Sequence, residues 1–193
     1  MEQPRRLVLA SGSRYRKALL ERLGLPFEVF SPDIDESPLA GEAPADTALR
    51  LSVLKAKAAA QRGELIIGSD QVAESGGRRY GKPGNHENAV RQLRELSGKA
   101  VDFHTAVSLL ASSTNQVQSR VVPCRVTFRR LDERRIQAYL EREKPYDCSA
   151  AAKAEGLGIA LIERIDTEDP SALIGLPLIA LSELLERAGL PAV

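Results

Sequence analysis

The strongest constraint on the fold is an apolar run near the N-terminus that turns directly into a helix. Residues 7–9 (LVL) have the composition of a buried strand, and residues 18–24 (ALLERLG) place three leucines on one helical face before a glycine. The stretch Ser11-Gly12-Ser13 joins the two, with Ser13 in position to cap the helix. The segment therefore predicts a strand, a tight turn and a helix in immediate succession.

The rest of the chain alternates in the same way between apolar runs and amphipathic segments. Strands are expected at residues 27–30, 65–67, 100–111, 117–128 and 158–165, and helices at 46–61, 87–96, 132–142 and 178–188. A polar turn at residues 112–115 separates two of these strands and favours an antiparallel pair. This pattern predicts an α/β domain built on a mixed sheet.

The size and charge of the chain narrow its class. With 193 residues, of which 43% are hydrophobic, the chain is expected to form one domain, residues 1–193, with a substantial core. A net charge of +1 gives no basic coat for nucleic acid or an anionic membrane, so neither partner is expected. No apolar run approaches a membrane span, and the N-terminus lacks the apolar segment of a signal peptide, which favours a cytoplasmic location.

The start of the first helix concentrates positive charge where a helix prefers negative charge. Its first turn carries Arg14, Arg16 and Lys17 and no acid. The small residues before it let backbone approach a ligand closely, and free N–H groups at a helix start bind anions. Arg16 adds a forked donor for phosphate oxygens. From the local sequence alone, a phosphate site and a capped surface helix with solvated arginines are equally well supported.

Two lysines on the next helix are expected to face opposite ways. At 100° per residue, the polar residues of segment 46–61 share a face that includes Lys57. Lys55 lies opposite, between Leu51 and Ala59, so its ammonium is directed to the interior or a cleft and needs an anionic partner. The partner can be a structural carboxylate or a bound phosphate, and the phosphate is favoured. Lys57 is expected to be solvated.

Acidic residues suggest a metal site. Asp33, Asp35 and Glu36 crowd one loop, and Asp70 follows residues 65–67 where that strand is expected to end. Chain exits at strand ends are common ligand sites in α/β folds. Two carboxylates from separate segments can hold Mg²⁺ or Mn²⁺, so Glu36 and Asp70 are the candidate ligands. Asp33 is expected to be solvated.

The residues that are missing also limit the chemistry. The two histidines, His86 and His104, form no metal-binding pattern, and the sequence contains no G-x-S-x-G elbow, so zinc chemistry and a Ser-His-Asp nucleophile are poorly supported. Cys124 and Cys148 form no CxxC pair; free thiols are expected, and one disulfide stays open. Lys82 in "YGKPG" reads as a solvated turn residue unless other phosphate-seeking groups join it. The remaining inventory suits metal-assisted displacement at phosphorus.

These segments, in this order, resemble the Maf family of nucleoside triphosphate pyrophosphatases over almost the whole chain. The resemblance rests on "LASGSRYRKALLERLG", "DIDES", Lys55 in "LKAKA", "IIGSDQV", "GKP" and "EGLGIALIERIDTEDPSALIGLPL". The pairing of "GSDQV" with "EGLGIALIERI" is most similar to the branch that hydrolyses 7-methyl-GTP.

The resemblance implies an inosine-triphosphatase-like fold, with a two-lobed mixed sheet flanked by helices and a central cleft, and it allows a homodimer. It implies hydrolysis of 7-methyl-GTP to 7-methyl-GMP and pyrophosphate with a divalent cation, Mg²⁺ or Mn²⁺, which would clear modified nucleotides. The positions carried over are catalytic Asp70, metal-binding Glu36 and Asp70, substrate-binding Ser11, Arg16, Lys55 and Lys82, and specificity-determining Tyr15, Gln71 and Glu155.

The chain departs from the family pattern at several places. Arg14 stands where proline is usual, Tyr15 replaces a tryptophan, and Thr105-Ala106 replaces Thr-Gly. The stretch "CSAAAKAEG" lacks the Gly-Ser-aromatic sequence expected before Lys153. The last two departures concern the base pocket more than the chemistry.

Other functions remain open at this point. The nearest alternative is the dTTP/UTP pyrophosphatase activity of the same family. A nucleotide-binding regulator of cell division with little turnover is an alternative of another class. An RNA-binding module is disfavoured, because the sequence has no basic stretch studded with aromatic residues.

Overall fold

The computed structural model describes residues 6–193. The chain divides into two compact units, which we describe separately. Unit 1 contains the residues up to Gln71, residues 105–122 and residues 169–193, and unit 2 contains residues 72–104 and 123–168. The single domain expected over residues 1–193 stays a prediction, and its first five residues lie outside the described part of the chain.

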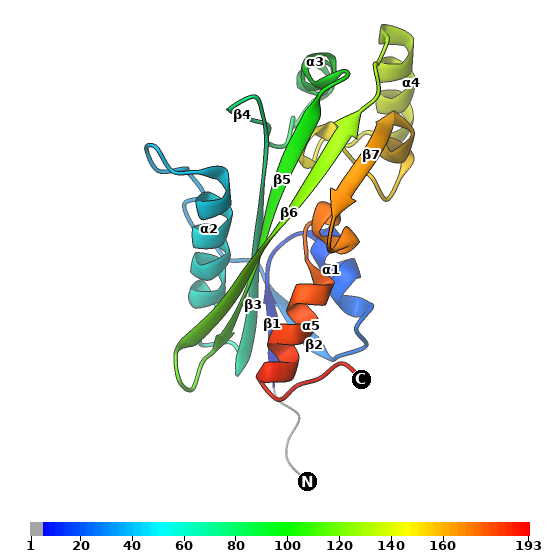
Figure 1. Ribbon diagram of the computed structural model, residues 1–193. Coiled ribbons are helices and arrows are strands. Elements are labelled where there is room, and N and C mark those ends of the chain that lie inside the picture. The colour runs from blue at the N-terminus through cyan, green and yellow to red at the C-terminus, as the bar shows by residue number, and fades with distance from the viewer. Residues whose placement is uncertain (1–5) are drawn as a thin grey trace. The chain divides into compact units, whose positions relative to one another are not determined.

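The described strands form one mixed, seven-stranded sheet with the order β2-β1-β3-β5-β6-β7, and β4 pairs with β3 (Figure 1). Its strands are β1 (Leu7–Ala10), β2 (Phe27–Phe30), β3 (Leu65–Ser75), β4 (Arg78–Arg79), β5 (Ala100–Ala111), β6 (Gln116–Phe128) and β7 (Ile162–Thr167). In unit 1, β1 runs parallel to both of its neighbours, and the last β1–β3 pair is Ala10 with Gly68. The mixed α/β sheet expected from the sequence is therefore confirmed.

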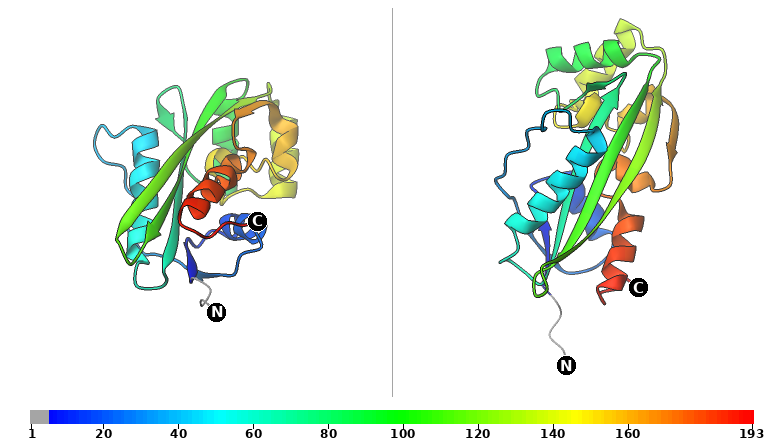
Figure 2. Two further views of the ribbon diagram at one scale, coloured as in Figure 1. Left: turned by 60° about the horizontal axis from the view of Figure 1, so that its bottom comes forward. Right: turned by 60° about the vertical axis from the view of Figure 1, so that its left-hand side comes forward.

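Helices cover both faces of the unit 1 strands. Helix α2 (Pro44–Ala58) lies on one face, and α1 (Arg14–Glu21) and α5 (Leu178–Arg187) lie on the other (Figures 1 and 2). Because side chains alternate along a strand, Leu7 and Leu9 join the core with α1 and α5, and Val8 and Ala10 join the core with α2. Burial of each such leucine contributes about 1.5–3 kcal/mol.

A glycine sets the distance between α2 and β3. A Cβ atom on Gly68 would lie 2.0 Å from the carbonyl oxygen of Ser52 and 2.7 Å from the backbone nitrogen of Ala56. No side chain fits there, so the helix backbone packs directly against the strand. This close approach brings Lys55 on α2 within reach of Asp70 on β3.

Unit 2 consists of the remaining strand segments with α3 (His86–Leu96), α4 (Glu133–Glu143) and short 3₁₀ turns. Asn85 and Asp132 cap the two helices with their side chains. The helices are linked by Arg94, whose guanidinium donates to both carboxylate oxygens of Glu133 at 2.9 and 2.8 Å.

The structure corrects two expected strands. The strand predicted at 158–165 is wrong at its start, because residues Leu157–Leu161 form a 3₁₀ turn (η2) before β7 begins. There the Gly158 N–H donates to the Lys153 carbonyl at 3.0 Å, and a Cβ atom at this position would lie 2.5 Å from that oxygen. The strand expected at 65–67 continues to Ser75, because β3 also pairs with β5 and β4. Asp70 therefore lies within a strand.

Across residues 6–193, the helices are too short or too polar to cross a bilayer. Both cysteines are free thiols, with Cys124 buried and Cys148 partly exposed. Burial raises the pKa of Cys124 to about 11, so this thiol is held in its unreactive protonated form.

Candidate functional site

The first part of the candidate site is the turn between β1 and α1. The side chain of Ser13 caps the helix by accepting from the Arg16 N–H at 3.4 Å, as expected from the sequence. Ser11 is buried, and its Oγ accepts from the Ser13 N–H at 3.2 Å and from Arg16 Nη1 at 3.3 Å. The turn therefore fixes Ser11 and the guanidinium of Arg16 beside the start of the helix.

Of the three cations in the first turn, Arg16 is the one directed to this turn. Its Nε donates to the Gly175 carbonyl at 2.8 Å, which ties α1 to the loop before α5. Desolvation lowers the pKa of Arg16, and the negative charges of Asp70 and Glu36 oppose that shift. The guanidinium stays charged at neutral pH. Lys17 instead points to the surface, where its Nζ lies 3.8 Å from Glu21 Oε1.

Lys55 joins two carboxylates. It is only 6% exposed, and its Nζ lies 2.6 Å from Asp70 Oδ1 and 2.8 Å from Glu36 Oε1. The inward direction expected from the helical pattern is confirmed, as is the exposure of Lys57. In the structure its partners are carboxylates; contact of Lys55 with a phosphate stays a prediction.

The prediction that Asp70 follows the end of its own strand is wrong. Asp70 is 7% exposed and lies within β3, two residues beyond the last pair with β1. It therefore lies past the carboxyl end of β1, at the level where the Ser11 turn begins. Asp70 Oδ2 accepts no hydrogen bond from residues 6–193, so this oxygen is available for further chemistry.

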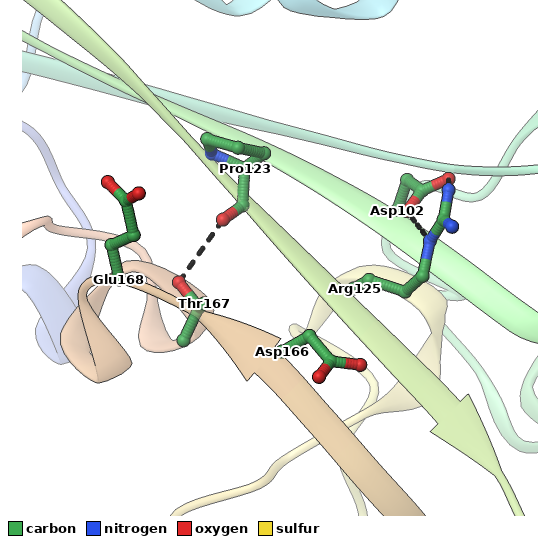
Figure 3. Close-up of a pocket in the computed structure, with 6 residues that line it drawn as sticks. All are labelled: Asp102, Pro123, Arg125, Asp166, Thr167 and Glu168. Atoms are coloured by element: carbon green, nitrogen blue, oxygen red, sulfur yellow. Dashed lines mark hydrogen bonds and ion pairs between the residues drawn. The ribbon is translucent and has the colours of Figure 1, made fainter.

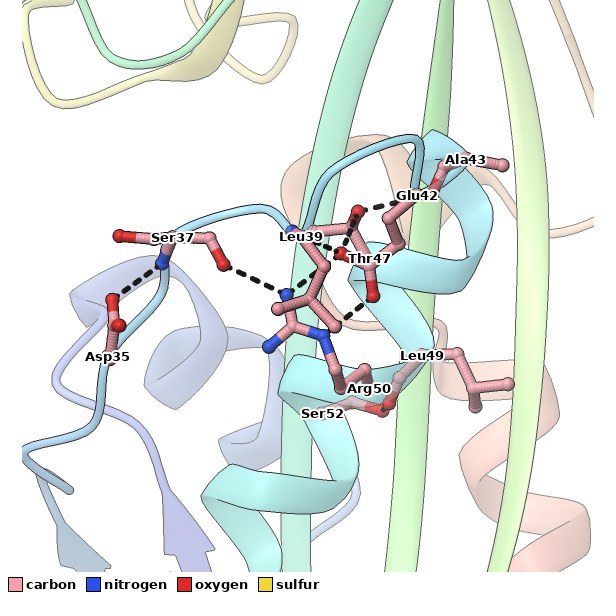
Figure 4. Close-up of polar contacts among 9 residues, drawn as sticks. All are labelled: Asp35, Ser37, Leu39, Glu42, Ala43, Thr47, Leu49, Arg50 and Ser52. Carbon is pink, nitrogen blue, oxygen red and sulfur yellow. Dashed lines mark hydrogen bonds and ion pairs between the residues drawn. The ribbon is translucent and has the colours of Figure 1, made fainter.

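The loop that carries Glu36 is anchored by an arginine (Figure 4). Arg50 Nε and Nη2 donate to the two carboxylate oxygens of Glu42 at 2.6 and 2.9 Å, and Nη2 also donates to the Ser37 carbonyl at 3.0 Å. These bonds lower the pKa of Glu42 to about 2. The loop is thus held against α2 next to Glu36, whose own side chain is 58% exposed.

Glu36 and Asp70 are the carboxylates that would hold a divalent cation near Lys55, and a bound cation stays a prediction. Glu36 and Asp70 both direct an oxygen to one cationic centre, the Lys55 ammonium, so their carboxylates converge. Hard divalent cations favour such oxygen ligands and take water or phosphate oxygens in the other positions. Among the described residues no group of three or more Asp, Glu, His or Cys side chains is placed to hold a metal ion. A bound cation would therefore rest on two protein carboxylates.

The structure adds a feature at Tyr15 that the sequence did not indicate. The guanidinium carbon of Arg14 lies 4.8 Å from the centre of the Tyr15 ring, and Arg14 Nη2 donates to the Tyr15 hydroxyl at 2.7 Å. One face of the ring is therefore covered by a cation of the chain itself. A cationic base that stacks on Tyr15 has to use the other face or displace Arg14.

Gln71 is held by Thr105, which the family pattern places at the base pocket, and by two backbone carbonyls. Its Nε2 lies 2.9 Å from Thr105 Oγ1, 2.9 Å from the Ala172 carbonyl and 3.1 Å from the Leu173 carbonyl. The family motif "PSALIGLPL" contains the two carbonyls, but the pattern does not predict that they contact Gln71, because the contacts span at least 34 residues of chain.

Lys82 and Glu155 belong to unit 2, so their roles at a site built on unit 1 stay predictions. Lys82 is exposed in the loop before α3 and makes no hydrogen bond or ion pair within the described part of the chain. Glu155 is exposed in a turn. In the preceding stretch, Ala150 and Ala151 adopt positive φ angles of 56° and 50°.

A hollow of about 660 Å³ in unit 2 is a poor candidate for a triphosphate (Figure 3). It is lined by Asp102, Pro123, Arg125, Asp166, Thr167 and Glu168. Its one cation, Arg125, already donates to both oxygens of Asp102 at 2.6 and 2.8 Å. The excess of negative charge disfavours polyanions.

Comparisons with known proteins agree with these observations. The family model described as "Maf-like protein" matches residues 6–188. A protein of Thiobacillus denitrificans named 7-methyl-GTP pyrophosphatase is 58% identical over 185 residues, which cover 95% of this chain and 92% of the relative. Proteins with the same name from Burkholderia orbicola and Cupriavidus pinatubonensis are 55% and 56% identical; the matches cover 98% and 96% of this chain and 92% and 94% of the relatives.

Proposed function

The chain belongs to the Maf-like protein family, and from that premise we propose that it hydrolyses 7-methyl-GTP to 7-methyl-GMP and pyrophosphate. The observation that carries the proposal is the convergence of Asp70, Glu36 and Lys55 in the unit that also holds Arg16 at the first helix start. The names of the relatives support the choice of nucleotide.

In this proposal the triphosphate binds at the turn before α1. The N–H groups of the first helical turn and the Arg16 guanidinium provide donors for phosphate oxygens. Lys55 adds positive charge where the pyrophosphate leaves, which stabilises the charge that develops on it. Lys82 is proposed to join these cations.

Asp70 is proposed as the general base. Its Oδ1 is held by Lys55, which leaves Oδ2 to take the proton of a water that attacks the α-phosphorus. A bound Mg²⁺ or Mn²⁺ would supply charge neutralisation and an orienting position for that water. Glu36 and Asp70 are the residues proposed to hold this cation.

Selection of the base is assigned to Tyr15, Gln71 and Glu155. Methylation at N7 gives guanine a positive charge, which an aromatic face and a carboxylate both attract. Tyrosine is a weaker partner for a cation than the tryptophan of the family pattern, and Arg14 already covers one face of the Tyr15 ring. The discrimination is therefore expected to be modest. A cytoplasmic location, a homodimer and the clearing of modified nucleotides complete the proposal.

The test is pyrophosphate release from 7-methyl-GTP, GTP, dTTP and UTP, each with Mg²⁺, with Mn²⁺ and with a chelator. The proposal predicts the highest kcat/KM for 7-methyl-GTP and no turnover with the chelator. Preference for dTTP or UTP would move the chain to the other activity of the family. Nucleotide binding without pyrophosphate release would support a regulator instead.

A further inference from the structure

The side-chain amide of Gln71 faces three oxygen atoms. Its Nε2 lies 2.9 Å from Thr105 Oγ1, 2.9 Å from the Ala172 carbonyl and 3.1 Å from the Leu173 carbonyl. All of these residues belong to unit 1. The two hydrogens of the amide group are therefore shared among three protein partners.

The chemistry of these partners determines which end of the amide faces them. Two of the partners are carbonyl oxygens, which only accept. The Thr105 hydroxyl donates its one hydrogen to the Ala172 carbonyl at 2.9 Å, so it also acts as an acceptor toward Gln71. Turning the amide over would place Gln71 Oε1 against three acceptors. Within residues 6–193, Oε1 accepts no hydrogen bond.

The frame that holds the two carbonyls is itself fixed by buried groups. Asp169 is 3% exposed; its Oδ1 accepts from the Ser171 N–H at 3.1 Å and its Oδ2 from the Ile179 N–H at 2.8 Å. The Leu178 N–H donates to Ser171 Oγ at 2.7 Å. These bonds cap the turn at 170–174 and the start of α5 together, so the carbonyls keep their places.

We propose that Thr105, with the carbonyls of residues 172 and 173, is a positioning residue that fixes Gln71 as a hydrogen-bond acceptor toward the nucleotide. The inference rests on the proposed function and adds that Gln71 accepts, and does not donate, the hydrogen bond to the nucleotide. Gln71 then selects substrates that offer a donor on the nucleoside. In 7-methylguanine the N1–H and 2-amino donors carry part of the positive charge, and a charged donor makes a stronger hydrogen bond. An acceptor at this position therefore favours the methylated base over guanine.

The test compares three variants with the wild type. Thr105→Val removes the hydroxyl, Thr105→Ser keeps it, and Ser108→Ala removes another buried hydroxyl of β5 that contacts Ser52 and Ser119 instead of Gln71. The readout is the ratio of kcat/KM for 7-methyl-GTP to that for 7-methyl-ITP, which lacks the 2-amino donor. A parallel arm uses 2′-deoxy-7-methyl-GTP, which lacks a ribose donor.

The wild type is expected to prefer the substrate that carries the additional donor, and Thr105→Val to reduce that preference by about 2- to 10-fold, the range of one hydrogen bond. Thr105→Ser and Ser108→Ala should retain the wild-type ratio. If Thr105→Val reduces the preference only in the comparison with 2′-deoxy-7-methyl-GTP, the donor belongs to the ribose, and Gln71 still acts as an acceptor. Unchanged ratios in both arms for Thr105→Val would overturn the inference.

Binding of the products separates this inference from the proposed function. Calorimetric affinities for 7-methyl-GMP and 7-methyl-IMP report the acceptor without any turnover. Suppose that the protein does not hydrolyse 7-methyl-GTP but binds 7-methyl-GMP more tightly than 7-methyl-IMP, and that Thr105→Val reduces this difference in affinity. That result would refute the activity and retain the inference. If Thr105→Val does not fold, Gln71→Met provides the same comparison: it should abolish the preference, and a retained preference would overturn the inference.

Discussion

At the scale of single residues, Lys55 and Lys57 separate two roles of one residue type on one helix. Lys55 is buried against Asp70 and Glu36, whereas Lys57 is exposed. Lys55→Met should lower kcat/KM for triphosphates by about 10²-fold, the loss typical of one group that stabilises developing charge. Lys57→Met is the matched control and should leave kcat/KM near the wild-type value. Equal effects of the two substitutions would contradict the assignment of the faces.

Arg14 is expected to weaken the preference for a cationic base. It lies over the Tyr15 ring, where it competes with a positively charged 7-methylguanine and repels it. Arg14→Gln should therefore raise the kcat/KM ratio of 7-methyl-GTP to GTP by about 2- to 5-fold, as expected for one exposed cation–π contact. Lys17→Gln removes a charge from the same helix start and should not change the ratio. A lower ratio in Arg14→Gln would show that Arg14 assists the base.

At the scale of elements, the loop before α2 should depend on pH through Glu42. Hydrogen bonds from Arg50 lower the pKa of Glu42 from 4.5 to about 2. A lowered pKa in the folded state stabilises the fold above pH 4.5, and this stabilisation is lost as the pH falls toward 2. In urea unfolding, wild type should be more stable than Glu42→Gln at pH 6, and the difference should shrink at pH 3.

The control for this prediction is Glu21→Gln. It removes an exposed ion pair in which Glu21 Oε1 lies 3.8 Å from Lys17 Nζ. Such a pair contributes little to the free energy of unfolding, so the variant should follow the wild type at both pH values. A constant difference between wild type and Glu42→Gln from pH 6 to pH 3 would contradict the role of the ionised Glu42.

The short turn η1 (Ser149–Ala151) carries backbone strain. Ala150 has φ 56° and ψ 21°, in the left-handed region that costs a residue with a Cβ atom about 1–2 kcal/mol. Glycine relieves this strain, but it has greater chain entropy and lacks the buried methyl group of Ala150, so Ala150→Gly should change the free energy of unfolding by less than about 0.5 kcal/mol. Ala152→Gly is the control: residue 152 has φ −99°, so glycine should destabilise the protein there. Destabilisation by both substitutions to the same extent would refute the strain.

At the scale of the whole molecule, the sequence predicts the elements whose apolar pattern is local. The leucines of residues 18–24 and Ser13 are sufficient to predict α1 and its cap. The spacing around Lys55 predicts that it is buried, because helical periodicity determines which side chains share a face. Glu36 and Asp70 were proposed as a pair of metal ligands and Lys55 was proposed independently, and the structure brings the three together.

The features that the sequence did not predict have two causes. The strand predicted at 158–165 fails at its start for a local reason, because Gly158 turns back to bond with the nearby Lys153. The other failures depend on contacts between distant segments. The end of β3 was misplaced because pairing with β5 extends the strand past Asp70. Local propensity contains no information about such partners. The contacts of Gln71 with its three acceptors were missed for the same reason.

The most direct test of the account is pyrophosphate release from 7-methyl-GTP by Asp70→Asn, with Asp33→Asn as the control. Asn keeps the size of the side chain, and urea unfolding establishes that the variant is folded. Because the amide cannot take a proton from water, Asp70→Asn should lose about 10²–10⁴-fold in kcat. Asp33 is an exposed acid of the loop that carries Glu36, and Asp33→Asn should retain wild-type kcat. A folded Asp70→Asn enzyme with near-normal kcat would contradict the central claim that Asp70 is the general base.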